Sequence, residues 1–556
     1  MGYVCLHAEK HYIGRVWSFN IFSRLTNLGP LKYPFFLIGI ALIVFAWLES
    51  YPVSIPSVER HVFDSISPIF WPGLSLVLGC LFLICKSSRN KKVKFVCAIT
   101  LTFFVYIHYL FFPLLPGSDA HYFRGLAKLF LTVGVDPLQQ SYFQWPSFFV
   151  LNSVLVEILG FSIDTVSILL FLTTGLLFSS SLFVFFSRDA EELGFVGVAL
   201  YFMGLFWFLN YQFAPQSLAL GLFFVLLCLV SRKDLSSTIA SLSVFASLAF
   251  MHAFIGVLFL LFYFVLTLCD RSRLNSFMLY SVIYLATLVY FTVYYFHDLV
   301  QTLANLSIVF WEQGEYGRIL QATLRGPVTI LDDVARTLSR GVTFSIWGVL
   351  LVGFLDRTLK KEIKIHDLSL LVAGSFHFLL GGFLHLLGAR ALQIMFVPAV
   401  SGYRLFLCRY KRIMTVYLLL IFMLFPFISL HQIYDITSVQ TASGERASDF
   451  MIGKTSMGKL ASRILAARED GYYVYANLKR DDLAHVSIEI IGPDPDVQFE
   501  DLFHKTYGSI IYNPSLEKRI TEYLDVRIDE VYEVRRHFTQ TYGKIFDDGY
   551  SCILRR

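Results

Sequence analysis

The apolar stretch 95–113 is followed closely by an acidic residue and a histidine. The next segment, LLPGSDAHYFRGLAKLF, contains Asp119, His121 and Tyr122. A carboxylate at a membrane–water boundary can reach both a lipid head group and a soluble hydroxyl, from which it can accept a proton as a general base. Asp119 or Ser118 can equally well cap the amino terminus of a helix, and the spacing alone leaves both interpretations open.

Polar or ionisable residues also stand at or near the ends of other apolar stretches. They are Glu157, Gln216, His252 and Arg390. Ionisable groups at membrane depth are costly to bury and are functional candidates by default. An arginine offers a bidentate fork to phosphate, whereas a lone histidine at a helix end is equally often structural. Gln216 either caps its helix or contacts a sugar.

The composition predicts an integral membrane protein that positions these residues on a bundle of helices. Of 556 residues, 56% are hydrophobic and only 16% are charged, whereas soluble domains carry about 25% charged residues. A spanning helix needs about 20 apolar residues, and about thirteen stretches meet or approach this length. The predicted spans are 34–50, 69–86, 95–113, 166–186, 194–211, 216–231, 236–251, 253–268, 276–296, 342–356, 367–387, 391–407 and 413–431.

Clusters of Lys and Arg separate the predicted spans at alternate connections, which is the pattern that sets orientation in a membrane. Placing every cluster in the cytoplasm gives a cytoplasmic segment 1–33, a transmembrane domain 34–431 and an extracytoplasmic segment 432–556. The net charge of +5 is distributed among these clusters, so we expect the bilayer, and no nucleic acid, as the partner of the basic residues.

Two external loops, 114–165 and 297–341, are long, whereas the cytoplasmic connections are short. This asymmetry predicts a working face outside the cytoplasm. The alternation requires that the apolar segment 146–160 be re-entrant or interfacial; the alternative is a tilted span. The residues from Tyr122 to Leu131 predict an interfacial amphipathic helix, with Arg124 and Lys128 on a face apart from the apolar one.

The sequence beyond Leu430 predicts a small soluble domain. Charged residues become frequent there, and apolar runs shorten. The segments 471–478, 485–492 and 508–513 have the composition of strands bounded by turn residues, and 446–468 has that of a helix. The fold class is therefore a polytopic α-helical membrane protein with a C-terminal extracytoplasmic α/β domain of ordinary size.

Several of these stretches together resemble the GT-C fold of membrane glycosyltransferases, which includes protein O-mannosyltransferases and the lipid A aminoarabinose transferase. GSDAHYF, an amphipathic helix, the Trp145–Pro146 turn, a second apolar helix and Gly160 resemble the first external loop of that family. Stretches that resemble its prokaryotic, especially archaeal, members are NYQFAPQSLALGLFF (210–224), LAFMHAFIGVLFLLF, GARALQIMFVPAV, TASGERASDF and YGKIFDDGYSCILRR. The resemblance covers most of residues 95–556. The two spans before residue 95 depart from it.

The resemblance implies an inverting transferase that moves a hexose or pentose from a polyprenyl-phosphate, or dolichyl-phosphate, donor to an extracytoplasmic hydroxyl. It implies Asp119 as the general base, and Arg390 and His252 at the donor phosphate. We add four substrate-binding candidates: His121, Tyr122, Gln216 and Glu157. The acceptor is a glycan, a lipid or a protein. The metal requirement stays open between no cofactor and a divalent ion, because His121 stands where a second carboxylate is expected.

A transporter or flippase for a lipid-linked saccharide is the alternative function, because such a protein also places charges at membrane depth. The odd number of predicted spans, the lack of a visible internal repeat and the external folded segment favour the enzyme. A polysaccharide polymerase or ligase would be another glycosyl transferase, and a receptor or structural membrane protein is the remaining class.

Overall fold

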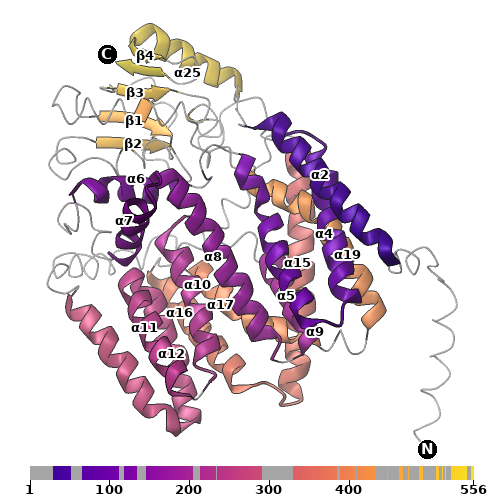
Figure 1. The fold of residues 1–556 in the computed structure, drawn as a ribbon. Coiled ribbons are helices and arrows are strands. Elements are labelled where there is room, and N and C mark those ends of the chain that lie inside the picture. Colours follow the sequence, from indigo (N-terminus) through magenta and orange to yellow (C-terminus); the bar gives the residue numbers. More distant parts are fainter. Residues whose placement is uncertain are drawn as a thin grey trace, which may run out of the picture.

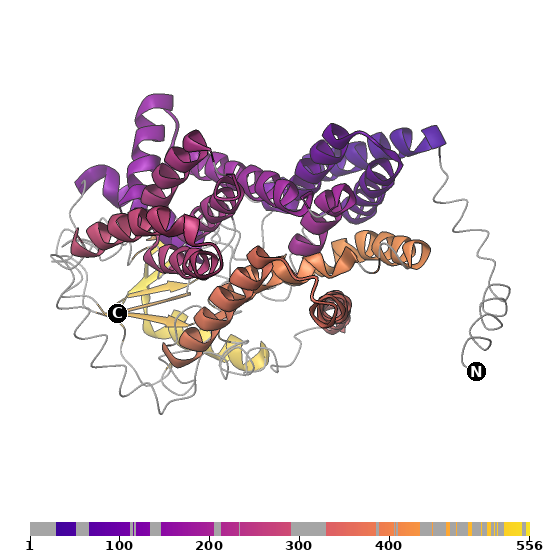
Figure 2. The ribbon, with the colours of Figure 1, turned by 90° about the horizontal axis from the view of Figure 1, so that it is seen from below.

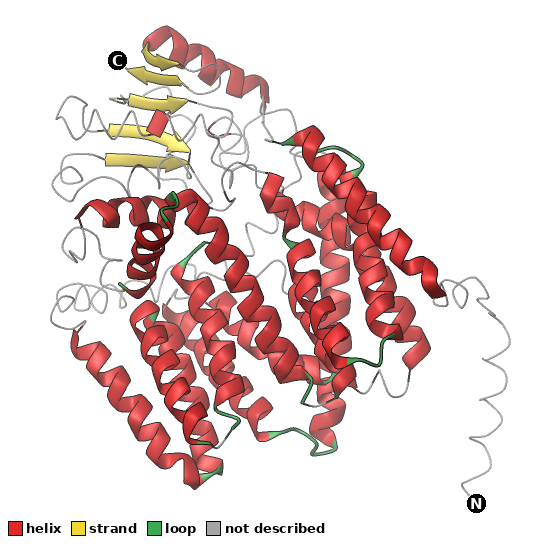
Figure 3. Cartoon of the chain, viewed as in Figure 1, coloured by secondary structure: helices red, strands yellow, loops and turns green. Residues whose placement is uncertain are grey.

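The computed structural model of the chain is dominated by helices, with a group of strands at one end (Figure 3). It describes residues 29–51, 66–111, 115, 118–133, 146–188, 190–204, 213–232, 234–290, 330–384, 388–404, 406, 410–433, 447–448, 463–467, 474, 487–491, 502, 507, 509–512, 516, 520, 528–547 and 552–555.

Helices make up the described residues of the first half of the chain. They are η2 (Gly29–Leu31), α2 (Lys32–Ser50), α4 (Phe70–Ser87), α5 (Lys91–Val105), η3 (Ile107–Phe111), α6 (Ser118–Val133), α7 (Ser147–Leu159), α8 (Ile163–Phe186), α9 (Glu191–Gly204), α10 (Pro215–Leu229), α11 (Leu235–Met251) and α12 (Ala253–Cys269). The later ones are η5 (Arg271–Arg273), the helical residues 274–290, α15 (Ile330–Leu359), α16 (Ile365–Leu384), α17 (Gly388–Ser401) and α19 (Lys411–Ile433). In Figure 2 the orange later helices run along one side of the purple and magenta ones.

Each of the thirteen ranges predicted as spans overlaps a helix in the described residues. Four helical segments are long and apolar enough to cross a membrane: α2, α4, α8 and the Gly341–Leu359 part of α15. Other apolar helices, such as α10 and α11, have 10–17 residues. The fold is thus that of a helical protein suited to membrane association, and the number of thirteen crossings stays a prediction.

Glycines allow two pairs of helices to approach closely. A Cβ at Gly39 of α2 would lie 3.0 Å from the carbonyl oxygen of Gly73 in α4, and one at Gly73 would lie 3.1 Å from the oxygen of Gly39. A Cβ at Gly353 of α15 would lie 2.1 Å from the oxygen of Gly402, just after α17. Small residues at helix crossings are typical of membrane bundles, where backbones pack without a hydrophobic driving force.

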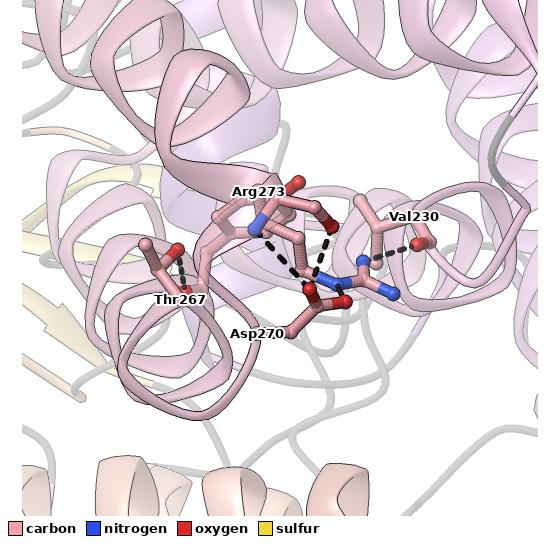
Figure 4. Close-up of polar contacts among 6 residues, drawn as sticks. Val230, Thr267, Asp270 and Arg273 are labelled. Atoms are coloured by element: carbon pink, nitrogen blue, oxygen red, sulfur yellow. Dashed lines mark hydrogen bonds and ion pairs between the residues drawn. The ribbon is translucent and has the colours of Figure 1, made fainter.

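The turn after α12 is fastened to the carboxyl end of α10 (Figure 4). The guanidinium of Arg273 donates a hydrogen bond of 2.8 Å to the carbonyl oxygen of Val230 and forms an ion pair with Asp270 at 3.2 Å. An arginine at a helix carboxyl end satisfies a carbonyl that has no partner within the helix, and its charge complements the helix dipole.

Other basic residues join helix ends at the same end of the bundle. Arg188, just after α8, donates a hydrogen bond of 2.9 Å to the carbonyl oxygen of Cys228 in α10. Lys94 in the first turn of α5 pairs with Glu191 in the first turn of α9 at 3.1 Å. Basic clusters that are far apart in the sequence therefore gather at one end of the helices, as the alternation of charged connections predicts.

The strands form one mixed sheet in the order β2-β1-β3-β5-β4. They are β1 (Arg463–Ala467), β2 (Ser487–Ile491), β3 (Ser509–Tyr512), β4 (Gly543–Asp547) and β5 (Cys552–Arg555). β1 is parallel to β2 and β3, whereas β5 is antiparallel to β3 and β4. Helix α25 (Ile528–Thr541) shares with the sheet a hydrophobic cluster that includes Leu465, Ile510 and Phe538 and is separate from that of the helical bundle.

Two strand predictions, 485–492 and 508–513, are confirmed by β2 and β3. The predicted helix 446–468 is wrong over β1, because this segment pairs with strands on both of its sides. Tertiary pairing overrides the helical preference of Leu and Ala, which is a weak preference in a short segment. Within the predicted strand 471–478, the described residue Val474 is helical.

Candidate functional site

Helices α6 and α7 form a short helical pair at one end of the bundle, on the side where the sheet also lies (Figure 1). They pack against each other and against the start of α8. α7 has 13 residues, which make a length of about 20 Å, well below the hydrocarbon thickness of about 30 Å. Helices of similar length, such as α9 and α10, lie within predicted spans, so the expectation that 146–160 does not cross a membrane stays a prediction.

The chain reverses sharply between α7 and α8. Gly160, with a φ of 65°, ends α7 in the left-handed conformation that glycine adopts without strain. The hydroxyl oxygen of Ser162 then accepts a hydrogen bond of 3.2 Å from the amide of Thr165, which caps α8. These two caps fix the angle at which the α6–α7 pair meets the first turn of α8.

An aromatic cluster joins α6 and α7 to the start of α10. The rings of Phe130 and Phe149 stack at 5.7 Å, and those of Phe123 and Phe148 meet edge to face at 6.2 Å. The ring of Phe148 also lies 5.1 Å from that of Phe213, two residues before α10. Aromatic packing of this kind holds helices in one arrangement, so α6, α7 and the amino terminus of α10 are positioned together.

An ion pair with a buried guanidinium and a partly exposed carboxylate fastens α6 to α8. The guanidinium of Arg124 lies 3.4 Å from the carboxylate of Asp164 in the first turn of α8. Arg124 is only 3% exposed, whereas the side chain of Asp164 is 38% exposed. The expectation that Arg124 lies on a polar surface face of an amphipathic helix is therefore wrong: this side chain points into the protein because its counter-ion lies there.

The predicted general base, Asp119, belongs to the first turn of α6. Its side chain lies outside the described residues, so its catalytic role stays a prediction. His121 is buried within the α6 packing. Tyr122 is half-buried, with its ring 5.3 Å from that of Phe123. Side chains of α6 are thus packed against the protein from Ala120, the residue after Asp119, onward.

His252 forms a one-residue break between α11 and α12. Its amide donates to the carbonyl oxygen of Leu248 at 2.9 Å, and its own carbonyl oxygen accepts from the amide of Gly256 at 3.2 Å. α11, which ends here, packs against α7. Gln216 is buried in the first turn of α10, near the aromatic cluster. His252 and Gln216 therefore lie at the end of the bundle that carries α6 and α7.

Arg390 is the third residue of α17, and its side chain lies outside the described residues. Its end of the bundle follows from helix direction. α16 begins beside the last turns of α12, where the ring of His366 stacks on that of Phe262 at 6.3 Å, and α17 begins where α16 ends. The start of α17 is thus at the end opposite the basic connections, which is the end of α6 and α7.

Glu157 is exposed on α7, away from the buried face of that helix. Of the predicted external loop 297–341, residues 297–329 lie outside the described part. Within the described residues, no three His, Cys, Asp or Glu side chains come together in a way that could hold a metal ion. The substrate-binding role of Glu157 and the metal requirement both stay open.

Sequence reasoning missed the Arg124–Asp164 pair. The available signal was an arginine three residues after His121 within a largely apolar helix, and an aspartate in the capped start of a long apolar helix. Comparison of the sequence with known protein families finds no matching family, and a search among curated proteins likewise finds no match.

Proposed function

We propose that this protein is an integral membrane glycosyltransferase that moves a sugar from a polyprenyl-phosphate donor to an acceptor hydroxyl. The observation that supports this most is the pair of short helices α6 and α7, which the ion pair between Arg124 and Asp164 fastens to α8, a candidate span. Such an arrangement holds the first turn of α6, with Asp119, at the boundary between the apolar bundle and the sheet-bearing end.

The proposed reaction uses groups that we expect to meet at this end. The acceptor oxygen attacks the anomeric carbon of the sugar, the bond from that carbon to the phosphate oxygen breaks, and Asp119 takes the hydroxyl proton. The leaving polyprenyl phosphate needs positive charge, which Arg390 supplies as a bidentate fork. His252 helps to position the same phosphate. Fixing donor and acceptor next to each other removes much of the entropic barrier.

The proposal places the α6–α7 end and the sheet outside the cytoplasm and the basic connections inside it. Introducing Glu157→Cys and, separately, Lys361→Cys tests this orientation in intact cells. A membrane-impermeant maleimide should label the first variant above the wild-type background and the second only after the membrane is permeabilised. Labelling of Lys361→Cys alone in intact cells would contradict the proposed orientation.

Covalent transfer is the property that separates the enzyme from a transporter. The purified full-length protein, reconstituted in liposomes with radiolabelled polyprenyl-phosphate sugars, should move label from the organic-soluble donor to an acceptor. A panel of hexose and pentose donors and of glycan, lipid and peptide acceptors is needed, because neither substrate is identified. Movement of intact donor between leaflets without any new glycosidic bond would favour a flippase and overturn the proposal.

A further inference from the structure

Exposed cations gather at the basic end of the bundle, around the connection from α4 to α5. Arg89 lies in this connection, and Lys91 and Lys92 are the first residues of α5; all of them are exposed. Lys32, the first residue of α2, reaches the same place, because its ammonium group donates a hydrogen bond to the hydroxyl oxygen of Ser87 at the end of α4. We call Lys32, Arg89, Lys91 and Lys92 the α5 basic patch.

The cations of this connection have no acidic partner within the part of the chain that the structure describes. Arg89, Lys91 and Lys92 form no ion pair there, although they are close to one another in the chain. The nearby acid Glu191 pairs with Lys94 instead, at 3.1 Å. These neighbouring positive charges therefore repel one another unless an anion from outside the chain lies among them.

The direction of α5 adds to this positive charge. The amino terminus of a helix carries a partial positive charge, which acidic residues in the first turn offset. α9 has Glu191 and Glu192 in its first turn, whereas the first turn of α5 contains Lys91 and Lys92 and no acid. The side chain of Asn90 accepts a hydrogen bond of 2.8 Å from the amide of Lys92, which caps α5 without neutralising it. An anion is thus attracted by the side chains and by the helix together.

The surface next to the patch selects a lipid over a soluble anion. Val96 lies four residues and Phe103 eleven residues after Lys92, and these spacings place the three side chains on one face of α5. Val96 is 58% exposed and Phe103 is 40% exposed, so this face turns away from the protein. Exposed apolar faces of helices in a membrane bundle contact acyl chains. A phospholipid whose chains lie along Val96 and Phe103 has its phosphate beside Lys92.

α2 approaches the same position from the other side. The ring of Phe36 in α2 meets that of Phe104, near the far end of α5, edge to face at 6.4 Å. Lys32 lies one turn before Phe36, so its backbone starts deeper in the bundle than that of Lys92. The side chain of Lys32 nevertheless extends to Ser87, at the end of α4. Lysines near helix ends extend in this way toward the level of lipid head groups.

We propose that the α5 basic patch binds the head group of an anionic phospholipid in the leaflet at the basic end of the bundle. The cations hold the negative head, and the exposed face of α5 contacts the chains. This inference goes beyond the proposed function and requires neither sugar transfer nor a role for Asp119. It assigns one position and one class of lipid to the general attraction between basic connections and membranes. A lipid held there by Lys32 and Lys92 also joins α2 to α5.

The test compares two lipids that differ in net charge. Phosphatidylglycerol and phosphatidylcholine each carry a diazirine close to the head group, and each is added in small amount to nanodiscs of unlabelled phosphatidylcholine that contain the full-length protein. After illumination, the protein is digested with chymotrypsin and the adducts are mapped by mass spectrometry. Phosphatidylglycerol should give about tenfold more adducts on residues 86–96 than phosphatidylcholine does. Equal yields there would overturn the inference, because the site would then not distinguish charge.

Variants locate the attraction in the patch. The triple variant Arg89→Gln/Lys91→Gln/Lys92→Gln should lower the phosphatidylglycerol yield on 86–96 to that of phosphatidylcholine. The charge-preserving variant Lys91→Arg/Lys92→Arg should keep the yield within about twofold of wild type. Arg232→Gln/Arg271→Gln is the matched control, because these exposed arginines lie at the same end of the bundle beside α10 and outside the patch. An undiminished yield in the triple variant, or an equal loss in the matched control, would refute the assignment to the patch.

Two measurements on the wild-type protein do not depend on whether a variant folds. Raising NaCl from about 0.1 M to about 1 M shortens the Debye length from about 10 Å to about 3 Å and should reduce the preference for phosphatidylglycerol strongly. A preference that salt leaves unchanged would contradict electrostatic binding. Inorganic pyrophosphate, added at constant ionic strength, should leave the adducts in place. Displacement of the lipid by pyrophosphate would show a site for soluble anions and would overturn the proposed lipid partner.

Discussion

Breaking the Arg124–Asp164 pair should loosen α6 locally, before the bundle itself unfolds. The perturbation is a double-mutant cycle with Arg124→Gln, Asp164→Asn and the double variant. Asp164→Asn keeps the size of the side chain and removes its charge, whereas Arg124→Gln removes the charge and also shortens the side chain; the cycle separates the coupling from these single effects. Because the pair is an ionic link between α6 and α8, its coupling energy reports how firmly α6 is held.

The magnitude follows from the geometry. Unit charges 3.4 Å apart attract by about 5 kcal/mol at an effective dielectric constant of about 20. Burial of the guanidinium opposes this attraction, and solvent reaches Asp164, so most of the gain is offset. We expect a coupling energy of about 1–2 kcal/mol, which corresponds to a factor of about 5–30 in the population of the open state.

Hydrogen–deuterium exchange of peptides from 118–133 measures this population, since amides of α6 exchange through local opening. Each single variant should speed exchange in α6, and the double variant should fall short of the product of the two effects by the coupling factor. Glu157→Gln, which neutralises an exposed carboxylate on α7, is the control and should leave α6 unchanged. Multiplicative effects in the double variant would refute the reasoning.

Two further predictions concern helix packing and capping. Gly353→Ala should lower the free energy of unfolding of the detergent-purified protein by about 1–3 kcal/mol, because its Cβ would meet the carbonyl oxygen of Gly402. The control Gly348→Ala, whose Cβ has nothing within 4 Å, should leave the stability unchanged. Equal thermal stability of the two variants would contradict the close crossing. A hydrogen bond from the Ser236 hydroxyl, helped by those from Ser237, lowers the pKa of Asp234 below its ordinary value of 3.8. The ionised Asp234 carboxylate therefore stabilises the first turn of α11 fully above pH 3.8, and this stabilisation declines at lower pH as the pKa of the folded state is approached. The difference in protection of the first-turn amides between wild type and Asp234→Ala should thus be constant from about pH 8 to about pH 5. A change of this difference within that range would contradict the prediction.

The helical elements follow from composition and periodicity, because runs of apolar residues of the right length have few alternatives to a helix in lipid. The end of α7 is compatible with its sequence, since Gly160 adopts the left-handed conformation there without strain. Even the gathering of basic residues at one end follows from their alternate spacing. These features depend on local sequence alone, or on the membrane as a common solvent.

The predictions that were wrong concern residues whose structure depends on partners distant in the sequence. Arg124 looks like a surface residue until Asp164, forty positions later, is placed beside it. The segment 463–467 looks helical until strands on either side pair with it. The side chains of Asp119 and Arg390 lie outside the described residues, so their meeting at one site remains a prediction.

Single-turnover transfer by Asp119→Asn is the most direct test of the account. With donor bound in excess of its dissociation constant, the loss of a general base should lower the transfer rate about 10²–10⁴-fold, while folding and binding of the polyisoprenyl phosphate persist. Asp356→Asn, at the basic end of the bundle and paired with Lys360, should transfer sugar at the wild-type rate. Undiminished transfer by Asp119→Asn would contradict the account.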